Sequence, residues 1–304
     1  MGNSLKEIRK EIASIKNIQK TTRAMKLVAN SKLKKAVEAA KRSRIYATKL
    51  NEVFNDIIQK TLSNGNLFEK NDILFVDKDR AIKMVDIVFI TSDKGLCGAF
   101  NSNTIKSVVA LMNEYKKQDI KVRLRGVGKT GIRYFNFNEI ELCDESDTLS
   151  SNPSDSAASE FIMKAVNDYI EGITDKVIII HNGFKNMLSQ EIQQVEILPF
   201  KVDLDEVATK TKSGANSGEM TIEPTDDEKQ ILDELVRQYI NYNMFYALID
   251  SLAAELSARM QAMDTATENA AELVRDLTIK HNKARQAAIT TELVEINAGA
   301  EAMK

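Results

Sequence analysis

Both ends of the chain carry apolar residues at the three- and four-residue spacing of a helix. In the N-terminal stretch this apolar stripe begins with Leu5, Ile8, Ile12 and Ile15. No glycine or proline interrupts the chain between positions 2 and 65, or between 224 and 299. Because glycine and proline are the main interruptions of helices, each end is predicted to be one long helix. A helix of about 60 residues spans roughly 90 Å, which exceeds the size of a small domain.

The C-terminal stretch keeps the same spacing for longer. Its apolar register runs through Leu232, Leu235, Tyr239, Tyr242, Tyr246, Ile249, Ala253, Leu256, Met260 and Met263, and on to His281, Ala284 and Ala288. Such spacing over more than three heptads is typical of a coiled coil. If both helices leave the centre of the chain side by side, they run antiparallel, and the C-terminal one extends about 14 residues past its partner. This alanine-rich end carries apolar residues that need other chains around them: Ile289, Leu293, Val294 and Ile296.

The centre of the chain alternates short β-branched runs with helical stretches. Strands are expected at 85–92, 120–127 and 176–182, and helices at 102–117, 131–137 and 156–170. This alternation predicts a parallel α/β sheet. The acidic stretch 141–147, "ELCDESD", is expected to be a solvated loop, because its spacing lacks the pattern of a calcium loop. The predicted division is therefore an N-terminal coiled-coil helix at 1–62, a central α/β domain at 63–224 and a C-terminal coiled-coil helix at 225–304.

Charge is distributed unevenly along the chain, although the net charge is only −2. Residues 1–60 hold 15 basic and 5 acidic residues, whereas residues 226–304 hold 8 basic and 14 acidic ones. A basic segment raises the possibility of nucleic acid or acidic lipid, but the acidic C-terminal stretch offers an internal or protein partner instead. The two cysteines, Cys97 and Cys143, have no metal-like spacing, which favours a reducing compartment. The sequence contains no apolar run of the roughly 20 residues that a membrane span needs.

The stretch "GVGKTG" at 126–131 resembles the end of a phosphate-binding loop. Gly128, Lys129 and Thr130 supply its last three positions, but the required first glycine is replaced by Arg123. A magnesium-binding aspartate would be expected after the apolar run of 176–180, where the chain has His181. We therefore interpret the stretch as a strand-to-helix turn. No catalytic, metal-binding or cofactor-binding residues are predicted, since Cys97 has no triad around it and neither His181 nor His281 has metal-ligand neighbours.

Three motifs carry a resemblance to a known family. They are "LKEIRKEIASIKNIQKTTRAMKLVANSKLKKA" at 5–36, "SDKGLCGAFN" at 92–101 and "NKARQAAITTELVEINAGAEA" at 282–302. In this order they resemble the γ subunit of F-type ATP synthases nearly end to end. The last includes Ile289, Thr290, Glu292, Glu295, Gly299, Ala300 and Ala302, the fixed positions of the C-terminal signature of that family.

The resemblance implies a non-enzymatic rotor. In this family the terminal helices form an antiparallel coiled coil inside a hexamer of three α and three β subunits, which bind and hydrolyse the nucleotide. The central α/β domain, which is Rossmann-like in this family, lies against ε and the membrane ring of c subunits. Ion-driven rotation of that ring turns the coil and changes the state of each β subunit. The resemblance further implies contacts with β-subunit loops for Arg23, Met25, Lys26, Arg285, Gln286, Thr290 and Glu295, with Met25 by default also a core residue of the coil.

The resemblance also implies location and partners. We expect a peripheral protein at the cytoplasmic face of a bacterial inner membrane, attached only through the complex, with no small-molecule substrate, cofactor or nucleic acid of its own. A bacterial origin is expected because the first helix begins almost at Met1. The alternatives are a nucleotide-binding α/β protein with coiled-coil arms and a coiled-coil scaffold that binds nucleic acid through its basic end.

Overall fold

The computed structural model describes residues 2–63, 81–200 and 228–303. The chain forms two compact units, one of residues 33–258 and one that pairs residues 1–32 with residues 259–304. The predicted boundary at 62/63 falls in the last turn of the N-terminal helix, and the predicted boundary at 224/225 lies outside the described residues.

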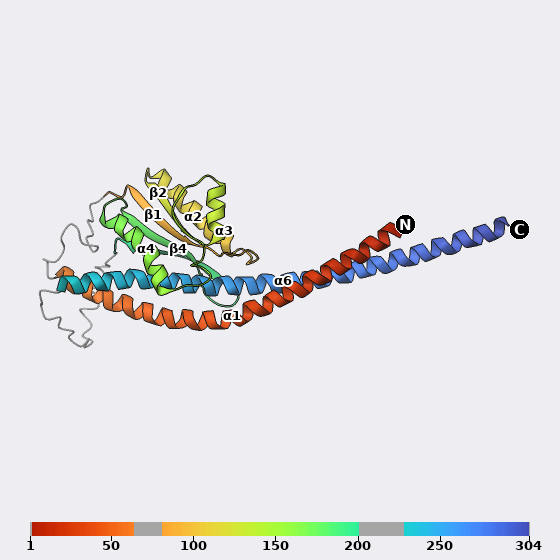
Figure 1. Ribbon diagram of the computed structural model, residues 1–304, viewed down its shortest axis with the longest axis horizontal. Coiled ribbons are helices and arrows are strands. Elements are labelled where there is room, and N and C mark those ends of the chain that lie inside the picture. Colours follow the sequence, from red (N-terminus) through yellow and green to blue (C-terminus); the bar gives the residue numbers. More distant parts are fainter. Residues whose placement is uncertain (1, 64–80, 201–227, 304) are drawn as a thin grey trace. The chain divides into compact units, whose positions relative to one another are not determined.

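Two long helices belong to both units (Figure 1). Helix α1 spans Gly2–Ser63, and helix α6 spans Glu228–Ala302. Their 62 and 75 residues confirm the two uninterrupted helices that the sequence predicts. Neither contains an interior proline, and Gly299 is the one interior glycine, three residues before the end of α6.

The described part of the α/β domain, which lies between the two helices in the sequence, contains five strands and three helices. The strands are β1 Met84–Ile90, β2 Lys121–Val127, β3 Leu142–Ser146, β4 Lys176–Phe184 and β5 Gln190–Leu198. The helices are α2 Phe100–Lys117, α3 Lys129–Phe137 and α4 Asp155–Ile170. The sheet order is β3-β2-β1-β4-β5, with β1, β2, β3 and β4 parallel. The four parallel strands follow the first four positions of the Rossmann order 3-2-1-4-5-6, and β5 is added at the edge in the opposite direction.

Two predictions for the centre were wrong. The sheet is mixed rather than parallel, because β5 returns antiparallel to β4. The stretch 141–147 contains the edge strand β3 rather than a solvated loop. Its acidic residue Asp144 places a carboxylate oxygen 3.0 Å from Lys164 Nζ and 3.8 Å from Arg125 Nη1. Polar partners inside the fold therefore let a charged segment occupy a strand, which composition alone does not indicate.

The sheet buries both faces, as a parallel sheet in an α/β domain does. On one face Val85, Ile87 and Phe89 of β1 pack in one cluster with residues of α2 and α3. On the other face Val88 and Ile90 belong to a cluster that includes residues of α4, α6 and Phe54 of α1. The domain is thus fixed to the long helices through a continuous apolar core.

Helix α6 is buried over a wide surface where it meets this domain. Ten of the twelve residues from 247 to 258 are buried. Val236, Ile240 and Met244 are fully buried, whereas Tyr239 and Tyr242 of the predicted register are only partly buried. The register predicted from the sequence was therefore incomplete here, because the helix packs in one cluster with both the sheet and α1 and needs more than one apolar stripe.

A buried ionic cluster lies on the same face of the sheet as α4. Asp86 on β1 is fully buried and accepts two hydrogen bonds of 2.7 Å from Arg123 and one of 3.0 Å from Arg125. Asp168 on α4 accepts from both arginines as well. The hydrogen bonds to Asp86 raise the pKa of the Arg123 guanidinium. Arg123 thus holds strands β1 and β2 and helix α4 together.

Replacing Asp86 tests this cluster. Asp86→Ala leaves Arg125 buried with one partner fewer, so we expect a loss of about 3–5 kcal/mol in the free energy of unfolding, measured with urea on the purified chain. Glu141→Ala, which removes an exposed carboxylate just before β3, is the matched control and should change stability by less than about 0.5 kcal/mol. Equal stability of the two variants would contradict the role of Asp86 as the partner that compensates the buried arginines.

Candidate partner-binding surface

The seam between α1 and α6 in the unit that holds both chain ends contains small and polar side chains. Ala29, Met263 and Ala270 are buried in it. The hydroxyl groups of Thr22 and Thr267 are joined by a hydrogen bond of 2.7 Å. Each hydroxyl oxygen also lies within hydrogen-bond distance of a carbonyl of its own helix, Thr22 of Gln19 at 3.1 Å and Thr267 of Met263 at 2.6 Å. The bond between the two threonines is therefore an added contact that forms only in this antiparallel register. We call residues 2–32 of α1 and 259–302 of α6 the terminal coil.

An ion pair lies one turn from the threonine pair. Lys26 Nζ donates a hydrogen bond to Asp264 Oδ1. The side chains are 37% and 45% exposed, so this pair contributes less than a buried one. Asp264 was not among the residues predicted from the sequence. The sequence did carry a signal for Asp264, namely an acidic residue in the C-terminal helix that can pair with the basic N-terminal helix.

The seven residues expected to contact a partner form two groups along the coil. Arg23, Met25 and Lys26 lie on α1 near the threonine pair, where Arg23 is exposed and the other two are partly buried. Arg285, Gln286, Thr290 and Glu295 are all exposed on α6, and the Thr290 hydroxyl donates 2.9 Å to the Gln286 carbonyl. Asp264, opposite Lys26, is 21 residues before Arg285, or roughly 30 Å along the helix. The structure therefore does not bring the two groups together.

The end of α6 has no partner helix in the described chain. With Thr22 opposite Thr267, the first residue of α1 lies opposite about position 287 of α6, and about 15 residues extend beyond it. We call residues 288–302 the overhang. It exposes four large apolar side chains: Ile289 at 49%, Leu293 at 56%, Val294 at 61% and Ile296 at 66%.

In the glycine turn that resembles a phosphate-binding loop, the backbone amides donate hydrogen bonds to other residues of the same chain. Gly128 links β2 to α3 at φ 95°, and the amide groups that follow it are already bonded. Lys129 N donates to Asp93 Oδ1 at 3.3 Å, Thr130 N to the Ser92 carbonyl at 3.1 Å, and Gly131 N to Thr91 Oγ1 at 3.0 Å. A phosphate group needs these donors free, so the turn is structural, as the sequence predicts.

The same contacts give a role to the motif "SDKGLCGAFN", which sequence analysis left without chemistry. Its Asp93 accepts from the first amide of α3 and also from the Ser151 hydroxyl. Its Ser92 and Asn101 form a buried network with Cys97, which is 2% exposed. The motif closes the carboxyl edge of the sheet, where related folds bind ligands.

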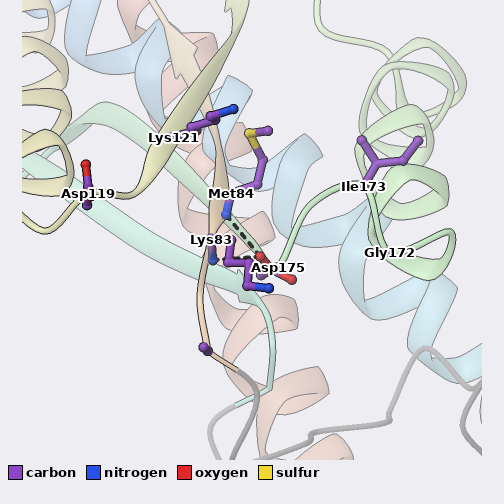
Figure 2. A pocket seen from close by; sticks show the side chains of 8 residues that line it. Lys83, Met84, Asp119, Lys121, Gly172, Ile173 and Asp175 are labelled. Atoms are coloured by element: carbon purple, nitrogen blue, oxygen red, sulfur yellow. Dashed lines mark hydrogen bonds between the residues drawn. The ribbon is translucent and has the colours of Figure 1, made fainter.

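A hollow of about 640 Å³ lies at the opposite, amino-terminal edge of the sheet (Figure 2). Lys83, Lys121 and Asp119 contribute to its lining. Its Asp175 accepts hydrogen bonds from the amides of Lys83 at 2.8 Å and Met84 at 2.9 Å. That carboxylate therefore holds the start of β1 in place.

The described part of the chain contains no group of three or more His, Cys, Asp or Glu side chains that could hold a metal ion. His181, at the place where a magnesium-binding aspartate would be needed, is paired with Asp250 instead. Among the described helices, none has a stretch apolar and long enough to span a bilayer.

The Gly128 turn yields a test of its structural role. A Cβ added at Gly128 would lie 2.0 Å from the Thr91 carbonyl oxygen, and the residue has φ +95°. Gly128→Ala should lower the unfolding free energy of the purified chain by about 3 kcal/mol or more. Gly95→Ala is the matched control, because nothing lies within 4 Å of its added Cβ. A Gly128→Ala protein as stable as the control would refute the close packing of this turn.

The chain has relatives along its whole length. The family model described as ATP synthase matches residues 4–303. The ATP synthase gamma chain of Wolinella succinogenes is 58% identical over 304 residues, covering all of both chains. That of Helicobacter pylori (strain Shi470) is 57% identical over 302 residues, covering 99% of each.

Solved structures with the same fold come from rotary assemblies. A chain of the central stalk and c-ring structure of the Tetrahymena thermophila mitochondrial ATP synthase matches with a TM-score of 0.58 and 27% identity, covering 81% of this chain and 99% of that one. A chain of the Euglena gracilis mitochondrial rotor matches with a TM-score of 0.64 at 16% identity over 95% of this chain and all of that one, a likeness of fold alone. The chain belongs to the ATP synthase gamma-chain family, and it is a non-catalytic central-stalk subunit in a complex whose β subunits perform the catalysis.

Proposed function

We propose that the terminal coil turns inside a hexamer of three α and three β subunits and changes the state of each β subunit in turn. The observation that carries this proposal is the overhang. About 15 residues of helix with exposed Ile289, Leu293, Val294 and Ile296 are unstable in water unless another chain surrounds them. A sleeve of several subunits around the helix meets that requirement.

The mechanism requires unequal contacts around the coil. A rotor shifts the equilibrium of a β subunit only if it contacts the states of that subunit with different free energies. The basic α1 helix supplies such a difference toward an acidic loop of a β subunit, and Arg23 and Met25 are placed to contribute. Lys26 is shared between this role and its ion pair with Asp264. Arg285, Gln286, Thr290 and Glu295 form the second contact group, nearer the end of α6.

The α/β domain, in this proposal, engages the ε subunit and the membrane ring of c subunits, so that ion-driven rotation of the ring reaches the coil. The protein then lies on the cytoplasmic face of a bacterial inner membrane and is held there only by the complex. The absence of free donors at the Gly128 turn supports a domain that transmits motion and binds no nucleotide of its own.

Reconstitution tests the proposal. The purified chain, mixed with α and β subunits from the same organism, should form a stable complex whose Mg-ATPase turnover depends on the chain, while the chain alone binds and hydrolyses no ATP. A chain truncated after His281 removes the second contact group and the overhang, and should lower turnover by about ten-fold or more at equal protein. Failure to form a complex, or ATP hydrolysis by the isolated chain, would refute the proposal and favour the nucleotide-binding alternative.

Charge reversal tests the basic contact group separately. Arg23→Glu brings a like charge to the acidic partner loop and should reduce turnover of the assembled complex by about five-fold or more at low salt. The difference should shrink as ionic strength rises, because exposed charges are screened. Lys41→Glu, an equally exposed reversal on α1 in the other unit, is the control. Equal turnover of both variants at low salt would count against contact through Arg23.

A further inference from the structure

One face of α6 is held by polar contacts at two points in the α/β unit. Asp250 and Ser257 lie seven residues apart, so they share a face about two turns of helix from one another. Between them Ala254 is fully buried and packs with Phe100 and Cys97 of the motif at 92–101. The small side chain lets the domain approach the helix backbone closely.

Asp250 bonds to the end of strand β4. Its Oδ2 lies 3.3 Å from His181 Nε2, and its Oδ1 accepts a 3.3 Å hydrogen bond from the Phe184 amide. Between these two residues the strand needs glycine, since a Cβ on Gly183 would lie 2.7 Å from Asp250 Oδ2. The His181 side chain is 1% exposed, and its Nδ1 has no hydrogen-bond partner in the described residues. Among the residues that the structure describes, Asp250 is therefore the one polar partner of the His181 ring.

Ser257 bonds to the hairpin between β4 and β5. Its hydroxyl donates to the Met187 carbonyl at 2.9 Å and accepts from Gln190 Nε2 at 3.4 Å. The two contact points thus link α6 to the end of β4 and to the loop that follows it.

These contacts differ in kind from the apolar core beside them. Apolar packing has no preferred direction, and it resists sliding or turning of a helix only through shape. Turning α6 by one residue, about 100°, would move the Asp250 carboxylate away from both partners and leave the buried His181 Nε2 without the contact that it now has. The polar contacts therefore fix the rotational setting of α6 in the domain.

We propose that Asp250 is a positioning residue for torque transmission: its bonds to His181 and Phe184 lock the α/β domain to α6, so that the domain and the helix turn as one body. This inference rests on the proposed rotor function, because only a rotating load requires such a lock. It predicts that loss of the carboxylate makes the joint between domain and helix softer without disconnecting it.

Angular fluctuations of a small bead on the complete α3β3 complex measure this softness. The bead is attached either to Lys106→Cys on α2 of the domain or to Thr48→Cys on α1, both exposed positions, with the exposed Cys143 replaced by Ser and the buried Cys97 retained. In the halted complex without ATP, Asp250→Ala should raise the angular variance of the Lys106→Cys bead about two-fold and leave that of the Thr48→Cys bead unchanged.

Two further variants keep the test decisive. Asp250→Asn keeps an oxygen for the Phe184 amide and should give a variance between those of the wild type and Asp250→Ala. Glu234→Ala removes an exposed carboxylate of α6 in the same unit and should match the wild type. A general loss of stability would not raise the variance at one bead position alone.

Wild-type variance of the Lys106→Cys bead in Asp250→Ala would overturn the proposal. If that variant does not assemble, wild-type variance in Asp250→Asn overturns it equally. Adding ATP then tests the proposed function on its own. If neither bead rotates with the wild-type chain while the difference in variance persists, the rotor function fails and the lock at Asp250 stands.

Discussion

The pairing of α1 with α6 is the constraint on which the rest of the structure depends. A helix of 75 residues presents far more surface than a small α/β domain can cover, and a single helix of that kind is marginal in water. The chain resolves this by using its own two ends as partners, with a hydrogen bond between Thr22 and Thr267 across the seam and small residues such as Ala29 and Ala270 allowing close approach. The length difference between the helices then makes an unpaired end unavoidable.

The α/β domain keeps the layout of a ligand-binding fold while using its binding positions for structure. The carboxyl edge of a Rossmann-like sheet normally presents free amides to a phosphate. Here Asp93, Ser92 and Thr91 take those amides, and Arg123 ties β1 to β2 and α4 through Asp86 and Asp168. The domain gains rigidity where a nucleotide-binding relative of the fold would keep an open site. Rigidity is the property that the proposed transmission of rotation through this domain requires.

Much of this architecture could be predicted from local patterns. The long helices followed from uninterrupted apolar spacing, the three central strands from their β-branched runs, and the structural nature of the Gly128 turn from Arg123 in place of a glycine. Strand β3 was missed because its charges are neutralised by Arg125 and Lys164, which are distant in sequence. Strand β5 was missed because its exposed edge residues are polar.

The candidate site was only partly predictable, because several of its contacts also join residues that are distant in sequence. The surface residues of the coil were named through family motifs, and the exposure of five of the seven agrees with a contact surface without assigning a partner to each. Asp264, Asp250 and Asp93 were missed, since each acts through a residue 36 to 238 positions away. A pattern of spacing along one helix carries no information about such partners.

The overhang has a consequence for the life of the protein outside its assembly. In the proposed assembly a newly made copy carries Leu293, Val294 and Ile296 in water until other subunits enclose them, and unassembled chains of this kind are subject to triage by chaperones and proteases. Partners that bind the folded chain and not the unfolded one shift the folding equilibrium toward the folded state by mass action. If the proposed hexamer encloses the overhang, the cellular level of this subunit follows the supply of its partners.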